Sequence, residues 1–286
     1  MSLQNHFNNK LEAYLTTLSS PSNNIIEAMC YSSLSKSKRL RPLLVYATGL
    51  HLNIELAALD SIAIAIELMH TYSLIHDDLP AMDDDDIRRG KPSNHIKFGE
   101  ATAILAGDAL QNLAIEAILE EPLTCDTKKN KMAIYLLRSS GYQGMIAGQC
   151  LDMELLDSPS LTFSTLQEIH LLKTACLLNA CIKLPLLLSD NVDMITKKRL
   201  DQLGSNLGLA FQIQDDYLDR YGDSQTLGKQ QGSDLASNKK TFADFYPQAE
   251  HAALITQYYQ QVEDALEGNN SSVFKELLEK LKVRQW

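Results

Sequence analysis

Apolar residues recur at helical spacing along most of the chain, whereas the alternating pattern of a strand is nearly absent. Residues 59–78 and 101–121 are rich in Ala, Ile and Leu at intervals of three to four residues, which predicts helices. Asp60 stands where an N-cap would begin the first helix, and Pro122 follows the second, where a helix should end. Similar patterns predict further helices over residues 131–156, 164–188, 195–221, 246–267 and 272–284. The expected fold class is therefore all-α.

The helices form one continuous series, without an internal repeat or a linker long enough to divide the chain. We therefore expect residues 1–286 to form a single domain. Two polar segments, residues 80–100 and 222–242, interrupt the helices, and both contain Gly and Lys and follow aspartate pairs. Long polar loops in a compact helical domain are often functional, so we interpret both segments as lids over a site.

Composition narrows the classes of function. Hydrophobic residues make up 45% of the chain, which supports a sizeable core, and the net charge of −10 disfavours binding to nucleic acid. The N-terminal residues lack the pattern of a signal peptide, and no uncharged apolar run approaches the length of a membrane span, so we expect a soluble, cytoplasmic protein. The five cysteines form no Cys-x-x-Cys pair, which indicates reduced thiols.

An acidic run stands out in LIHDDLPAMDDDDIRRG, residues 74–90. Crowded carboxylates repel one another, so such a run is either fully solvated or holds a cation. Asp77 and Asp83 are six residues apart, which on a straight helix would separate them by about 240°. Pro80 disrupts the helix between them, so the chain can turn and bring Asp83 back towards Asp77.

A second aspartate cluster lies downstream in AFQIQDDYLDRYGD, residues 210–223. Asp215 and Asp219 are four residues apart and share one helix face, whereas Asp216 points elsewhere. The cluster is either a solvent-facing stripe or, given its apolar neighbours, a partly buried site where unpaired carboxylates would be costly. Two carboxylate clusters that face one cavity would suit Mg²⁺, which shares its coordination with a phosphate-bearing substrate.

Basic residues that could bind phosphate accompany both clusters. Each alone is compatible with an ordinary surface charge, but together they form two cationic sets, which fits two anionic groups. These residues are Lys38, Arg41, Arg88, Arg89, Lys173, Lys229 and Lys239. Pro42 offers a good first position for a helix directly after Arg41. His70 lies about two helical turns before Asp77 on the same face, as either a core residue or a ligand.

The stretches KRLRP, HTYSLIHDDLPAMDDDDIRRGKPSNHIKFGEATAILAGDAL and GLAFQIQDDYLD resemble the trans-isoprenyl diphosphate synthase family, and within it the bacterial farnesyl diphosphate synthases most of all. The resemblance runs from about residue 25 to residue 242. It implies an all-α bundle around a deep central cavity, usually in a homodimer. It also implies condensation of isopentenyl diphosphate with an allylic diphosphate.

The resemblance assigns roles to individual residues of this sequence. For the metal, it implies two Mg²⁺ ions at Asp77 and Asp83 and a third at Asp215, with Asp78 and Asp219 in support. The implied allylic diphosphate ligands are Arg88, Lys173 and Lys229. The implied ligands of isopentenyl diphosphate are Lys38, Arg41, His70 and Arg89. Thr174 and Gln212 would place their oxygens near the developing carbocation.

Product length is expected to depend on Tyr72, five residues before Asp77, where an aromatic residue in this family typically blocks the floor of the tunnel. Together with the Asp-Asp-x4-Asp spacing of the first cluster, that position resembles the bacterial enzymes that stop at fifteen carbons, although ordinary helix packing of Tyr72 is compatible with the same geometry. A geranyl or geranylgeranyl diphosphate synthase, a class I terpene cyclase and an inactive helical subunit remain alternatives.

Three departures from the family pattern are visible. Lys36 and Ser37 replace two usual glycines, and Asn238 replaces a glycine before Lys239, which weakens the assignment of Lys239 as a ligand. The C-terminal KLKVRQW has no clear match.

Overall fold

The computed structural model describes residues 2–155, 158, 161–190, 192–222, 240–266 and 272–283 of the chain. Backbone contacts divide the chain into two compact units. Of the described residues, the first unit comprises 2–136 and 184–190, and the second comprises those within 137–183 and 192–283. Almost all the described residues with regular structure are helical, which confirms the predicted all-α class. The expectation of a single domain stays a prediction.

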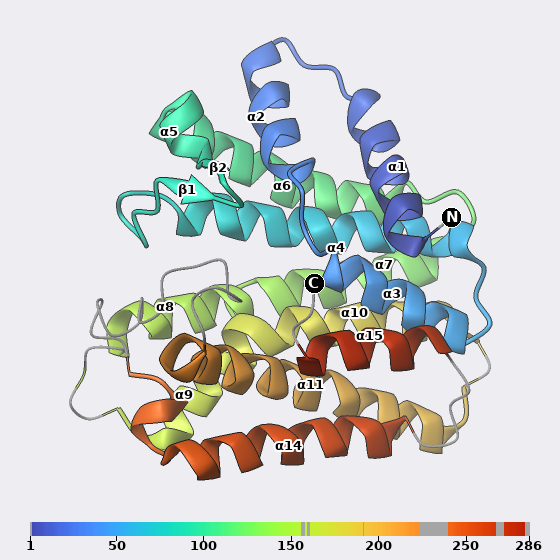
Figure 1. Ribbon diagram of the computed structural model, residues 1–286. Helices are drawn as coiled ribbons and strands as arrows, with labels where there is room; N and C mark the ends of the chain where they lie inside the picture. The colour runs from blue at the N-terminus through green and yellow to red at the C-terminus, as the bar shows by residue number, and fades with distance from the viewer. Residues whose placement is uncertain are drawn as a thin grey trace. The chain divides into compact units, whose positions relative to one another are not determined.

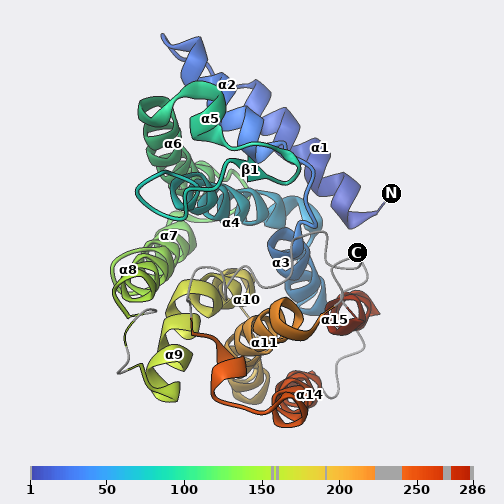
Figure 2. The same cartoon turned by 60° about the vertical axis from the view of Figure 1, so that its left-hand side comes forward.

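The first unit is built on two long helices, α4 and α6, which run side by side (Figures 1 and 2). Helices α1, α2 and α3 pack against α4, and α2 and α5 also contact α6. The only strands among the described residues are β1 and β2, which form a short antiparallel hairpin. The elements are α1 (Leu3–Thr16), α2 (Asn23–Ser33), α3 (Leu40–His51), α4 (Leu56–Asp77), β1 (Ile87–Arg88), β2 (Lys91–Pro92), α5 (Asn94–Phe98), α6 (Glu100–Leu119) and most of α7 (Asp126–Ser140).

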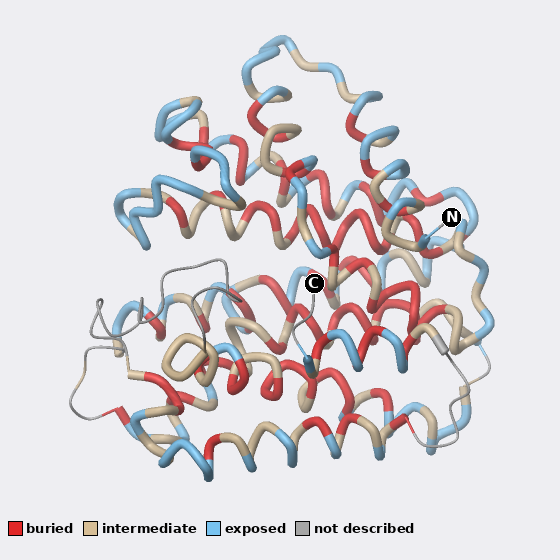
Figure 3. Tube along the Cα trace, in the orientation of Figure 1, coloured by how far each residue is buried: buried red, intermediate tan, exposed pale blue. Residues whose placement is uncertain are grey.

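Helix α4 is the centre of this unit, and most of its length is buried (Figure 3). A helix that is apolar on all sides must be enclosed by other elements. The helix begins at Leu56 with Glu55 as its N-cap, so the prediction of an N-cap at Asp60 is wrong. Asp60 instead lies inside the helix, where it accepts a hydrogen bond from Tyr46 at 2.8 Å and pairs with His6 of α1 at 2.8 Å. These partners lie far away in the sequence, so the local pattern could not indicate them.

The second unit surrounds helix α11, which packs along α14. Phe242 is fully buried in a cluster with Leu209 and Ile213 of α11. A π-helical turn, η1, joins α9 to α10. The elements are the end of α7, α8 (Met145–Leu155), α9 (Phe163–His170), η1 (Leu171–Ala175), α10 (Cys176–Leu188, whose last residues belong to the first unit), α11 (Met194–Tyr221), η2 (Phe242–Asp244), α14 (Gln248–Ala265) and α15 (Ser272–Val283).

The structure differs from the predicted helices in several places. The helix predicted over 131–156 is broken between α7 and α8, where Gly144 donates its N–H to the carbonyl of Gly141 at 2.9 Å. Helices α1 and α2 were not predicted, and for α3 only a start at Pro42 was. Pro42 is the third residue of α3 and not the first, because the helix already begins at Leu40. The polar segment 80–100 contains the hairpin and α5, whereas most of the second polar segment lies outside the described residues.

Three stretches of helix are long and apolar enough to cross a membrane, judged by length and composition alone: Leu56–Asp77, Glu100–Leu119 and Phe163–Leu188. In the first, 72% of the apolar window is buried inside the protein, so the core accounts for its composition. The absence of a membrane span stays a prediction. The five cysteines are free, as expected.

Candidate active site

The first aspartate cluster forms a closed turn at the end of α4. The helix ends at Asp77, and Asp78 is its C-cap. The N–H of Asp83 then donates to the carbonyl oxygen of Asp77 at 2.8 Å, and the N–H of Met82 donates to the carbonyl of Leu79 at 2.8 Å. The predicted return of the chain after Pro80 is therefore confirmed, and main-chain bonds bring Asp77 and Asp83 together.

Arg88 is tied to this turn by ion pairs. Its Nε donates to Oδ1 of Asp78 at 2.8 Å, its Nη2 bonds the same oxygen, and Nη2 also donates to Asp85 at 2.9 Å. Asp78 is buried, and burial raises the pKa of its carboxyl while the hydrogen bond from Arg88 opposes that shift. Arg88 therefore stands beside the aspartate turn in a fixed orientation.

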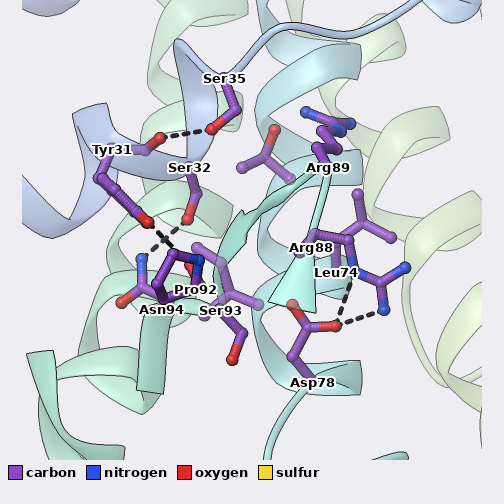
Figure 4. Close-up of a pocket in the computed structure, with 12 residues that line it drawn as sticks. Tyr31, Ser32, Ser35, Leu74, Asp78, Arg88, Arg89, Pro92, Ser93 and Asn94 are labelled. Carbon is purple, nitrogen blue, oxygen red and sulfur yellow. Dashed lines mark hydrogen bonds and ion pairs between the residues drawn. The ribbon is translucent and has the colours of Figure 1, made fainter. Parts of the chain in front are cut away.

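Arg88 and Arg89 lie on the β1–β2 hairpin, whose two-residue turn places Arg89 and Gly90 at φ 55° and 75°. Positive φ at both central residues is the signature of a type I′ turn. The hairpin is anchored to α2, since the Tyr31 hydroxyl donates to the carbonyl of Pro92 at 2.8 Å. Just beyond the hairpin, Asn94 donates to the carbonyl of Ala28 at 2.9 Å. It also donates to Ser32 at 2.8 Å (Figure 4).

These anchors enclose a small polar pocket of about 20 Å³. That volume is enough for one water molecule. Figure 4 shows Arg88, Arg89 and Asp78 at one side and Tyr31, Ser93 and Asn94 at the other. The remaining lining residues are Ser32, Ser35, Thr71, Leu74, Ile75 and Pro92.

The expected isopentenyl diphosphate residues gather at the start of α3 and the middle of α4. Nη1 of Arg41 lies 3.2 Å from Nε2 of His70. Burial, together with the charges of Arg41, Arg89 and the other nearby arginines, lowers the pKa of His70 well below 6.5. His70 is therefore neutral and can accept a hydrogen bond from Arg41. Lys38 lies two residues before α3.

A buried ion pair beside this group was missed at the sequence level. Nη1 of Arg39 donates to Glu67 at 2.6 Å, and the same guanidinium donates to Asn8 at 3.0 Å and to the carbonyl oxygens of Ser33 and Ser35. Arg39 has φ 51° and caps α3, so this pair fixes one of the two residues between Lys38 and Arg41. One signal was available, because Glu67 is the only acid within the apolar residues 61–76, and a buried acid needs a partner.

Tyr72, expected at the floor of the tunnel, is buried on α4. Burial and the nearby Asp77 charge raise its pKa to about 12. Its hydroxyl has no hydrogen-bond partner among the residues that the structure describes. The ring lies edge-on to His76, with centroids 5.8 Å apart.

The second unit carries the other predicted residues. Nζ of Lys173 donates to Asp152 at 2.5 Å, and Asp152 is a partner that the sequence pattern did not indicate. The Thr174 hydroxyl donates to the side-chain oxygen of Gln212 at 3.2 Å, so the structure brings these two predicted residues together. Gln212 in turn donates to Asp216 at 3.1 Å.

The second aspartate cluster divides as predicted. Asp216 is buried and accepts a hydrogen bond from the N–H of Phe242 at 3.0 Å. Asp215 is exposed and Asp219 is half-buried. Asp216 therefore points into the protein core, whereas Asp215 and Asp219 face away from it. Lys229 and Lys239, the predicted ligands in the second polar segment, lie outside the described residues.

Within the described part of the chain, no three His, Cys, Asp or Glu side chains converge to hold an ion by themselves. The donors at Asp77 and Asp83 nevertheless fit magnesium, because they are carboxylate oxygens at least partly open to solvent. Magnesium usually takes one or two protein carboxylates and completes its coordination with water and substrate phosphate.

Known proteins that are similar to this chain point to one family. The family model described as polyprenyl synthetase matches residues 23–280. The farnesyl diphosphate synthase of Haemophilus influenzae is 46% identical over 241 residues, which is 84% of this chain and 81% of that protein.

Two solved structures are also similar. The geranyltransferase of Legionella pneumophila has a TM-score of 0.90 at 39% identity, covering 99% of this chain and 95% of that one. A geranyltransferase of Helicobacter pylori, solved with magnesium and isoprenyl diphosphate, has a TM-score of 0.82 at 29% identity, covering 99% and 97%. The predicted isoprenoid synthase fold is confirmed by these likenesses, and the chain belongs to the polyprenyl synthetase family.

Proposed function

We propose that this protein is a Mg²⁺-dependent farnesyl diphosphate synthase, which condenses isopentenyl diphosphate with dimethylallyl or geranyl diphosphate. The observation that carries the proposal is the 46% identity to a farnesyl diphosphate synthase over most of both chains. The closed turn of Asp77 and Asp83 beside Arg88 supports it, because an anionic leaving group needs that combination of metal ligands and cation.

The reaction needs no protein nucleophile. The carbon–oxygen bond of the allylic diphosphate breaks, and its electron pair leaves with the diphosphate. The double bond of isopentenyl diphosphate then supplies the electrons of the new carbon–carbon bond to the allylic cation. Loss of a proton, in our proposal to the released diphosphate, restores a double bond. When bound, magnesium would neutralise the charge that develops on the leaving diphosphate.

The side chains take complementary parts in this proposal. Asp77, Asp83 and Asp215 would hold the metal, and Arg88 and Lys173 would bind the allylic diphosphate. Lys38, Arg41, His70 and Arg89 would bind isopentenyl diphosphate; neutral His70 would add a hydrogen bond without a charge. Thr174 and Gln212, already bonded to each other, would present oxygens near the cation.

The expected assembly is a homodimer in the cytoplasm. In the first unit, Ile104 and Leu105 of α6 are 43% and 58% exposed, and Ile134 of α7 is 49% exposed. A second copy of the chain would cover these apolar side chains. Light scattering coupled to gel filtration would measure the mass, and a monomer at micromolar concentration would contradict this assembly.

Product chain length tests the function directly. Purified protein would be incubated with Mg²⁺, isopentenyl diphosphate and dimethylallyl diphosphate, and the dephosphorylated products resolved by chromatography. A dominant fifteen-carbon alcohol is expected. Ten or twenty carbons would keep the chemistry and point to a geranyl or geranylgeranyl diphosphate synthase. A cyclic hydrocarbon would indicate a terpene cyclase, which has no use for a second cationic set, and no product from any allylic substrate would indicate an inactive subunit.

A further inference from the structure

The predicted residues Lys173 and Thr174 do not lie in an ordinary α-helix. They occupy the π-helical turn η1, closed by a bond from the N–H of Cys176 to the carbonyl of Leu171. A π turn holds one residue more than an α turn, so it changes the direction of the side chains in it relative to an uninterrupted α-helix. The direction of Lys173 and Thr174 therefore depends on whatever keeps this turn in place.

Helix α8 approaches the turn with its backbone. A Cβ atom added at Gly148 would lie 2.6 Å from Cα of Lys173 and closer still to its backbone nitrogen. Real Cβ atoms do not approach other atoms so closely, and the obstacle is main chain, which cannot rotate aside. Only glycine therefore allows α8 to pack at this distance from Lys173.

Helix α11 makes the same kind of approach. A Cβ atom added at Gly208 would lie 2.6 Å from Cα of Ala175 and closer still to its Cβ. Two glycines on two different helices thus lie against the same five-residue turn.

Each of the two helices also binds a side chain of the turn, four residues further along. Asp152 follows Gly148 on α8 and accepts the hydrogen bond of Lys173 at 2.5 Å. Gln212 follows Gly208 on α11 and accepts the hydrogen bond of Thr174 at 3.2 Å. Residues four apart on a helix lie on one face, so on each helix the glycine sets the distance and the polar residue sets the direction.

We infer that Gly148 and Gly208 are positioning residues, which orient the side chains that face the transferred allylic group. They hold the π turn so that the Lys173 ammonium and the Thr174 hydroxyl meet the allylic diphosphate and its cation. The inference rests on the proposed function and adds to it two residues that never touch substrate.

The test compares Gly148→Ala and Gly208→Ala with Gly204→Ala. Gly204 is a matched control on α11, because its added Cβ would lie 2.7 Å from Cα of Asn179, on α10 and outside the π turn. In the folded protein, checked by circular dichroism at the assay temperature, the first two variants should lose about 10- to 100-fold in kcat. Their KM for isopentenyl diphosphate should change less than about twofold, and Gly204→Ala should keep its kcat within about threefold.

Two further variants separate positioning from general damage. In a Lys173→Ala background, Gly148→Ala should lower kcat by a smaller factor than it does in the wild-type background, since only one of the two directed side chains, Thr174, remains to be displaced. Ala175→Gly should restore part, but not all, of the kcat lost in Gly208→Ala, because it removes the nearest atom that the new methyl group meets while Cα of residue 175 still lies 2.6 Å away.

The outcomes are distinct. An active wild-type protein whose Gly148→Ala and Gly204→Ala variants behave alike would overturn the inference, as would full additivity with Lys173→Ala. A wild-type protein without any product would instead refute the proposed function.

Discussion

Arg39 and Glu67 form an ion pair at 2.6 Å with side chains only 3% and 2% exposed. The pair joins the start of α3 to the middle of α4, three residues before His70. Neither side chain is proposed to touch substrate. The pair instead holds in place the backbone next to Lys38, Arg41 and His70, the proposed ligands of isopentenyl diphosphate.

Glu67→Gln should destabilise the first unit by about 3 kcal/mol, because removing one partner leaves the other charge buried without compensation. Chemical denaturation would measure the loss, and KM for isopentenyl diphosphate should rise because Arg39 lies between Lys38 and Arg41. Glu276→Gln is the control, since the exposed Lys280–Glu276 pair should contribute less than about 1 kcal/mol. Equal losses in the two variants would contradict this prediction.

Asp78→Asn should raise KM for the allylic diphosphate about tenfold, because Arg88 loses the buried carboxylate that orients it. Asp85 contacts the same guanidinium at 2.9 Å from an exposed position, with its side chain 52% exposed. Asp85→Asn should therefore change KM less than about twofold. Steady-state kinetics with geranyl diphosphate would compare the two, and a larger effect at Asp85 would refute the assigned role of Asp78.

Asp77→Ala and Asp83→Ala should each lower kcat at least about 100-fold and raise the Mg²⁺ concentration needed for half-maximal rate. Asp84→Asn is the control, because Asp84 belongs to the same acidic run but has φ 53°, a conformation that Asn also tolerates. Chelation of divalent ions should abolish product formation by the wild-type protein. Full activity of Asp77→Ala would remove the metal proposal.

Tyr72→Ala should shift the product from fifteen towards twenty carbons if the ring closes the cavity. Tyr72→Phe keeps the ring and removes a hydroxyl that lacks a partner in the described part of the structure. That variant should keep the product length and either leave stability unchanged or raise it by about 1 kcal/mol. Chromatography would measure the chain length of the products from the wild-type protein and the two variants. Identical chain lengths from all three would show that Tyr72 only packs against its neighbours in the helix bundle.

The second unit should lose stability in mild acid because of His170. Burial, assisted by the charge of Lys173, lowers the pKa of His170 from 6.5 to about 3. Its ring stacks on Phe242, and Nε2 lies 3.7 Å from Asp216, beyond hydrogen-bond distance. Below pH 6.5 the unfolded chain takes up a proton that the folded one does not, so stability should fall by about 1.4 kcal/mol per pH unit between pH 6.5 and about 3.

Denaturation of wild-type protein and His170→Gln at several pH values would measure this dependence. The variant should be less stable at pH 7 but decline less steeply below pH 6.5. Parallel declines would assign the acid sensitivity to other groups.

The sequence allowed prediction of those features that depend on neighbouring residues. The apolar run of α4 and the turn at Pro80 are local, and both were predicted. Helix α1 was missed, although Phe7, Leu11 and Leu15 recur every four residues and are its buried face. The Arg39–Glu67 pair and the approach of Gly148 to Lys173 could not be predicted, because each depends on how two separate helices meet.

The turn that returns Asp83 to Asp77 is closed by main-chain atoms, so it does not depend on either side chain. During the evolution of such a chain, the fold can therefore be kept while the catalytic activity is lost. After gene duplication, a copy that exchanged one of these carboxylates would keep its turn and its fold while losing its reaction. It would be inherited as a folded protein without catalytic activity, and a single codon would separate it from an enzyme.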